Sequence, residues 1–259
     1  MLFTSAELAS WIGGLLWPLT RIGALLSVAP MFSARVLPRR VRAALALALT
    51  VAVLPLLPPA PAIEPFSADG VIVLIQQLLI GLFMGLVLRL VFAALETAGQ
   101  VVATQMGLGF ASLVDPVNGG QMPLLSQFYS MFGMLIFLAL DGHLVLIRML
   151  VDSFRALPVG TDGLSLVRYR ELAEAGVRIF AGALSVGLPA IASLMVVNLA
   201  FGVMSRAAPQ LNIFAVGLPI TLIFGLLILL FSLPALAPEV ARMLDEGYRQ
   251  IAGMLRAGG

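Results

Sequence analysis

The side chains best suited to acid–base, nucleophilic or metal chemistry are few in this sequence and stand apart from one another. The chain has one histidine, His143, and no cysteine. One histidine cannot build an HExxH zinc site, and the lack of cysteine excludes thiol catalysis, disulfides and cysteine-ligated metals. Asp115-Pro116 and Asp141-Gly142 are typical of turns and helix ends rather than of facing catalytic carboxylates. We therefore expect a non-enzymatic protein with no catalytic residues, no metal site and no cofactor.

Charged side chains inside apolar segments are the second place to look for function. Arg21 lies near the middle of the first apolar segment, and a central arginine costs about 2.5–3.5 kcal/mol to insert into a bilayer. It needs a partner, a water-filled cavity or a neighbouring subunit, and we expect an inter-helix or inter-subunit contact. Arg89 lies near a segment end, where its side chain can reach the membrane surface.

The elements that must hold these residues are apolar helices. Apolar residues make up 61% of the 259 residues and charged residues only 11%, so the polar surface of a soluble domain is missing. We predict an all-α integral membrane protein with about six long helices, and each has close to or more than the roughly 20 residues that cross a bilayer. The predicted helices lie in the segments 8–33, 41–60, 71–95, 124–147, 177–204 and 211–237.

Glycine and proline interrupt these segments. Gly81-x3-Gly85 predicts a close approach between two helices. Pro189 and Pro219 each lie two residues after a glycine within apolar runs, and Pro234 lies in a third apolar stretch. Such prolines are either tolerated kinks or breaks at a substrate path, and the sequence leaves both interpretations open.

The arginines do not agree on one membrane orientation. Four arginines in residues 33–42 favour a cytoplasmic loop and an extracytoplasmic N-terminus. The arginines in residues 148–178 and in the tail after Pro238 favour the opposite membrane orientation. Both of these stretches also predict amphipathic helices, the first at about 165–178. Either residues 96–123 add a crossing or re-entrant pass, or the chain is not an ordinary bilayer bundle.

The most unusual segment is MGLGFASLVDPVNGGQMP, residues 106–123. Its glycines, prolines and Asp-Pro turn exclude a continuous helix, yet it is too apolar for a solvated loop. Non-helical backbone at membrane depth must be buried in protein or line a cavity. Adaptable methionines and other apolar side chains can close a pore by fit and dewetting. The segment is thus either a buried structural loop or a pore seal.

Residues 99–123, which contain this segment, resemble the matching stretch of the FliR family of type III export-gate subunits. RIGALLSVAPMFSARVLPRRVRAALALAL (21–49), DGHLVLIRMLVDSFRALPVG (141–160) and RAAPQLNIFAVGLPIT (206–221) match in the same order. The family serves flagella and virulence injectisomes, and the match is closer to the flagellar branch.

The resemblance implies a core subunit of the flagellar protein export gate, which forms and seals the channel for unfolded flagellar proteins. It implies a FliP-like helical part at 1–174, with the pore loop, and a FliQ-like helical hairpin with an amphipathic tail at 175–259. The implied partners are FliP-like and FliQ-like subunits, an FlhB-like protein and the exported flagellar proteins, in a hetero-oligomer of the bacterial inner membrane at the flagellar basal body.

The resemblance also implies roles for particular residues. The turn of Arg206, Pro209 and Gln210 would face the cytoplasmic entrance, and Arg21 would contact another subunit. The pore plug would consist of Met106, Gly107, Leu108, Gly109, Phe110, Ala111, Ser112, Leu113, Val114, Asp115 and Pro116, with a return through Met122 and Pro123. The alternative function is a small-molecule secondary transporter with a midplane site at broken helices and Arg21 as an anion contact.

Overall fold

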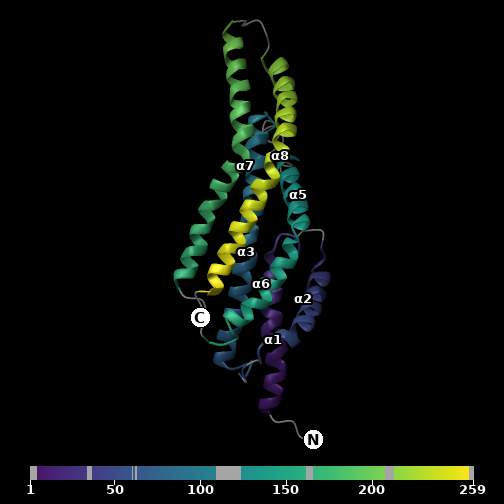
Figure 1. The fold of residues 1–259 in the computed structure, drawn as a ribbon, viewed down its shortest axis with the longest axis vertical. Helices are drawn as coiled ribbons and strands as arrows, with labels where there is room; N and C mark the ends of the chain where they lie inside the picture. The colour runs from purple at the N-terminus through teal and green to yellow at the C-terminus, as the bar shows by residue number, and fades with distance from the viewer. Residues whose placement is uncertain are drawn as a thin grey trace. The chain divides into compact units, whose positions relative to one another are not determined.

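The computed structural model describes residues 5–33, 37–59, 61, 63–108, 124–161, 166–207 and 213–256. All regular structure in these residues is helical, which confirms the predicted all-α class. The elements are α1 Ser5–Val28, α2 Arg39–Val53, the 3-10 helix η1 Leu54–Leu56, α3 Ala68–Gln105, α5 Leu124–Ala139, α6 Gly142–Ala156, α7 Leu166–Ala207 and α8 Ile213–Arg256 (Figure 1).

The described residues contain fewer candidate membrane spans than the six predicted. Ala68–Gln105, Phe180–Ala207 and Gly217–Arg256 are long and apolar enough to cross a membrane, and α5 with α6 makes a fourth span if the bent pair counts as one. α2 falls short because its 15 residues reach only about 22 Å at the helical rise, against about 30 Å of hydrocarbon. Proline then stops it at η1.

The predicted helix at 124–147 is wrong as a single helix. α5 ends at Ala139, and α6 begins at Gly142. Asp141, between them, has a φ of 53°, in the left-handed region that a right-handed helix cannot continue through. The Asp141-Gly142 turn expected from the sequence is therefore the place where the helix is interrupted.

α7 and α8 are longer than predicted. α7 takes in the amphipathic stretch near 165–178, and α8 continues through Pro238 to Arg256. Pro189, Pro219 and Pro234 also lie inside continuous helices, so of the two interpretations left open for these prolines the structure agrees with the tolerated kink. Neighbouring helices and local adjustments can satisfy the backbone groups that a proline frees, which makes such prolines tolerable.

The chain groups into two compact units. Unit 1 consists of Met1–Leu90, Asp141–Gly176 and Asp245–Gly259, and unit 2 consists of Val91–Leu140 and Val177–Leu244. α3, α7 and α8 each contribute residues to both units.

In unit 1, α1 packs closely against α3. A Cβ atom added at Gly81 would fall on the backbone carbonyl oxygen of Arg21, and one at Gly85 would lie 2.9 Å from the carbonyl oxygen of Leu25. Gly81 faces Arg21, and Gly85, four residues later, faces Leu25, which is also four residues later. The two helices therefore run in the same direction here. This contact confirms the close approach predicted from Gly81-x3-Gly85.

In unit 2, the second part of α3 lies against both α5 and α7. A Cβ at Gly99 would lie 2.6 Å from the carbonyl oxygen of Leu125 in α5. A Cβ at Gly182 of α7 would lie 3.3 Å from the Cβ atom of Ala94 in α3. α7 and α8 pair in opposite directions, since Gly182 faces Met243 whereas Gly202 and Gly217 line one cavity. These pairings bring the end of α3 beside both helices of the antiparallel pair.

Candidate functional site

The predicted plug begins where α3 ends. Gly107 has a φ of 81°, and its N–H donates to the carbonyl oxygen of Thr104 at 3.0 Å. The N–H of Leu108 donates to the carbonyl oxygen of Ala103, also at 3.0 Å. These two bonds form a Schellman motif, which ends a helix at a left-handed residue. The glycine at this position therefore ends α3 and sets the direction of the chain that follows.

Met106, the last residue before this turn, is buried in unit 2 rather than exposed. Its side chain is 1% exposed and lies against Gly225 of α8. A Cβ added at Gly225 would lie 2.5 Å from both Cγ and Cε of Met106 and 2.7 Å from its Sδ. The missing side chain of Gly225 leaves a notch in α8, and the methionine fills it.

A cavity of about 390 Å³ lies beside this contact in unit 2. Asn198 of α7, one of its lining residues, donates from Nδ2 to the carbonyl oxygen of Gln105 at 3.3 Å and to Oε1 of that residue at 3.4 Å. Both distances are at the long end for hydrogen bonds. The cavity is lined by Thr104, Gln105, Gly107, Asn198, Phe201, Gly202, Ser205, Gly217, Leu218 and Thr221.

The structure places only part of each predicted loop. Arg206 lies exposed in the last turn of α7, and Met106, Gly107 and Leu108 form the end of α3. The remaining predicted residues lie outside the described part of the chain: Gly109, Phe110, Ala111, Ser112, Leu113, Val114, Asp115, Pro116, Met122, Pro123, Pro209 and Gln210.

Arg21 forms the most elaborate polar cluster in unit 1, and its side chain is fully buried. Its Nε donates to Oε1 of Gln77 in α3 at 2.8 Å, and its Nη1 donates to Oγ of Ser153 in α6 at 3.0 Å. Its Nη2 donates to the carbonyl oxygen of Leu157 at 2.8 Å. The guanidinium carbon also lies 4.1 Å from the centre of the Phe154 ring, in cation–π geometry.

Of the two contacts expected for Arg21, the structure shows the inter-helix one, which joins α1 to α3 and α6. The inter-subunit contact stays a prediction, and the side chain has no exposed surface within this chain from which to make it. Sequence reasoning missed Gln77, Ser153, Asn198 and Gly225. Gln77 and Asn198 carried a usable signal, because each is a large polar residue inside an apolar segment.

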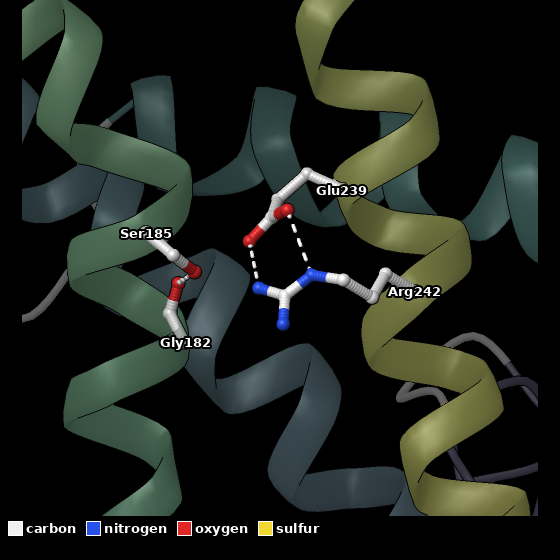
Figure 2. A network of polar contacts seen from close by, with 4 residues as sticks. All are labelled: Gly182, Ser185, Glu239 and Arg242. Atoms are coloured by element: carbon white, nitrogen blue, oxygen red, sulfur yellow. Dashed lines mark hydrogen bonds and ion pairs between the residues drawn. The ribbon is translucent and has the colours of Figure 1, made fainter.

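A second polar group lies on α7 and α8 in unit 2. Figure 2 shows Glu239 and Arg242 pointing from α8 toward α7, with Nε of Arg242 3.0 Å from Oε2 of Glu239. On α7, Oγ of Ser185 donates to the carbonyl oxygen of Gly182 at 2.9 Å. The Arg242 side chain is 54% exposed, and ion pairs this open contribute little to stability. Among the described residues, no group of three or more His, Asp or Glu side chains is placed to hold a metal.

Comparisons with known proteins agree with the resemblance found in the sequence. The family model described as "Bacterial export proteins, family 1" matches residues 12–247. The chain is 40% identical over 252 residues to the flagellar biosynthetic protein FliR of Escherichia coli (strain K12), covering 97% of this chain and 96% of that protein. It is 35% identical over 229 residues to FliR of Aquifex aeolicus (strain VF5), covering 88% of each. These matches confirm the FliR resemblance, and the chain belongs to family 1 of the bacterial export proteins.

Proposed function

We propose that this chain is a core subunit of the flagellar type III protein export gate, where it helps to form and seal the channel for unfolded flagellar proteins. The observation that carries the proposal is the similarity to FliR proteins along nearly the whole chain, at 40% identity over 97% of it. The proposed role is not enzymatic. The chain shapes and closes a passage, and other components supply the energy.

The exposed apolar faces of α7 and α8 support an assembly with other subunits. In the most apolar windows of Phe180–Ala207 and Gly217–Arg256, only 28% and 22% of the residues are buried, against 50% in α3. Faces this apolar need a cover other than water. We propose that FliP-like and FliQ-like subunits supply much of it, that an FlhB-like protein joins them, and that the assembly sits in the bacterial inner membrane at the flagellar basal body.

Within the chain, we propose a FliP-like part at 1–174 and a FliQ-like helical hairpin at 175–259. The antiparallel pairing of α7 with α8 supports the second part, because a hairpin needs two neighbouring helices of opposite direction. In this scheme Arg206, Pro209 and Gln210 form the turn of the hairpin at the cytoplasmic entrance.

We propose the loop 106–123 as the plug of the channel. Its support is the family resemblance of the loop, together with its apolar composition and the Schellman turn that ends α3 at Gly107. The turn gives the loop a defined starting point, which a segment that must close a pore by fit requires.

We do not retain the small-molecule transporter as an alternative function, because neither Arg21 nor the prolines in the apolar helices offer what a transport site would need. The guanidinium of Arg21 is buried and bonded to three groups of its own chain, so it does not offer itself to an anion. The helices that could have been broken at a substrate path are continuous through their prolines.

The plug is tested by replacing residues 109–121 with a short Gly-Ser linker in cells that lack their own FliR protein. We expect the variant to co-purify with FliP-like and FliQ-like subunits and to raise ion leakage through the inner membrane several-fold. Unchanged leakage in an intact assembly would contradict the plug. Failure of the unaltered chain to co-purify with those subunits would contradict the export-gate role itself.

A further inference from the structure

We propose that Gly225 of α8 is a positioning residue for the plug. It leaves the notch that holds Met106 and so fixes the end of α3 from which the plug begins. The inference rests on the proposed plug function and adds to it the part of the fold that holds one end of the loop in place.

The contact between the two residues leaves no room for a side chain at position 225. A Cβ there would lie within 2.7 Å of Cγ, Sδ and Cε of Met106. Real Cβ atoms are not found this close to other heavy atoms, so one side must move. Because Cγ is only two bonds from the Met106 backbone, rotation of the terminal methyl alone cannot relieve the overlap.

A shift of Met106 changes the start of the plug because the next residue is the turn itself. Gly107 holds its left-handed conformation through a bond from its N–H to Thr104, and Leu108 closes the motif on Ala103. The residue immediately before this turn is buried in unit 2 at 1% exposure. Displacing it re-aims the turn, and with it the chain that enters the plug.

The packing of Met106 is one of two ties at this junction, and the bonds from Asn198 to Gln105 are the other. The bonds from Asn198 to Gln105, at 3.3 and 3.4 Å, exceed the usual range of about 2.7–3.2 Å for N–H···O bonds. The neighbouring cavity of about 390 Å³, lined by Gln105 and Gly107, can also receive a displaced methionine. A methyl group at position 225 is thus expected to move Met106 rather than unfold unit 2.

The test compares Gly225→Ala with Gly253→Ala in the assembled gate. Both glycines lie inside α8, so both substitutions bring a gain in helix propensity. A Cβ at Gly253 meets nothing within 4 Å, which makes this variant the matched control. We expect Gly225→Ala to raise ion leakage several-fold with normal co-purification of the other subunits, and Gly253→Ala to leave leakage unchanged.

A second pair of variants shows whether the effect acts through Met106. Met106→Ala removes all three atoms that a Cβ at position 225 would strike. We expect this variant to leak because the notch is empty, and we expect Gly225→Ala to add no further leakage in that background. A merely structural effect of alanine at 225 would add its full increment instead, since independent substitutions act additively.

The outcomes separate this inference from the plug itself. If the linker replacement of the loop leaks and Gly225→Ala does not, the plug stands and the positioning role is wrong. If the linker replacement does not leak, both are wrong. If Gly225→Ala prevents assembly, the double variant of Gly225→Ala and Met106→Ala decides: restored assembly supports the contact with Met106, and continued failure overturns the positioning role.

Discussion

At the scale of single residues, Arg21 requires an explanation because a buried guanidinium must satisfy its own donors. Insertion of a central arginine costs about 2.5–3.5 kcal/mol. Three bonds from a charged donor, each contributing about 1.5–3 kcal/mol, offset that cost. Ser153 is suited to its part, because its hydroxyl accepts from Arg21 while it donates to the carbonyl oxygen of Leu150 at 2.6 Å.

Replacing Arg21 with alanine is expected to destabilise unit 1 by about 2–5 kcal/mol. The substitution leaves a cavity over Phe154 and unpaired acceptors on Gln77 and Leu157. Arg21→Lys should recover only part of the loss, since an ammonium group cannot reproduce a planar fork directed at three partners. Thermal unfolding of the purified complex measures both.

Arg40, which is exposed, provides the control. Arg40→Ala should change the thermal unfolding midpoint of the complex by no more than about 1 °C, because surface substitutions usually change stability by less than about 0.5 kcal/mol. An Arg21→Ala complex as stable as the unaltered one would show that the cluster contributes nothing.

The need of Arg21 for partners could be predicted from the sequence, whereas the partners themselves could not. A charge in an apolar run is a local pattern with a large energetic cost. Gln77 and Ser153 lie 56 and 132 positions further along the chain. Which of the chain's polar residues meets Arg21 depends on how helices pack, and one sequence does not record that packing.

At the scale of helices, the contact of α1 with α3 depends on two glycines whose neighbours cannot yield. A Cβ at Gly81 would strike the backbone carbonyl of Arg21 and lie 2.9 Å from Cβ of Ala24. We expect Gly81→Ala to force the helices apart and destabilise the chain by about 1–3 kcal/mol, the usual cost of overpacking.

Gly23 is a matched control for that prediction, because it lies on α1 and a Cβ there meets nothing within 4 Å. Gly23→Ala should be neutral or stabilise by up to about 1 kcal/mol through helix propensity. The measurement is the unfolding midpoint of each purified variant. Equal midpoints for Gly81→Ala and Gly23→Ala would rule out the close packing of α1 on α3.

The sequence predicted that helices form more accurately than it predicted the residues at which they begin and end. Long apolar runs and Gly81-x3-Gly85 are local signals, and the all-α class and the close helix contact that they predicted were confirmed. The prolines left two interpretations open because a proline breaks a helix only when nothing else satisfies the freed backbone groups, and that depends on neighbours. Sequence reasoning did not assign Gly107 to a helix end, although glycine favours the left-handed conformation with which it ends α3.

At the scale of the whole molecule, the apolar content exceeds what one chain buries. Apolar residues are 61% of the sequence, yet the faces of α7 and α8 remain largely uncovered in the chain. Along α7, Ala183, Val186, Ala190 and Leu194 are buried, whereas other apolar side chains such as Leu184 and Leu188 are exposed. α7 therefore packs within unit 2 through one apolar side and presents a second apolar side outward.

Three exposed positions on α7 can show whether other subunits or lipid cover its outward apolar side. Val196, Leu199 and Val203 are 68%, 71% and 62% exposed, and their spacing places them on one side of the helix. If other subunits cover this side, Val196→Trp and Leu199→Trp should reduce co-purification with FliP-like and FliQ-like subunits several-fold, because a packed interface cannot accept the added volume.

Val196→Ile is the matched control, since it keeps the branched shape and adds a single methylene. It should co-purify normally, and membrane fractionation should show all three variants inserted to the same extent. Fluid lipid accepts an indole ring as readily as an isopropyl group, so normal co-purification of both tryptophan variants would mean that lipid covers this face. That result would leave α7 at the rim of any assembly and would require the subunit contacts to lie on other helices.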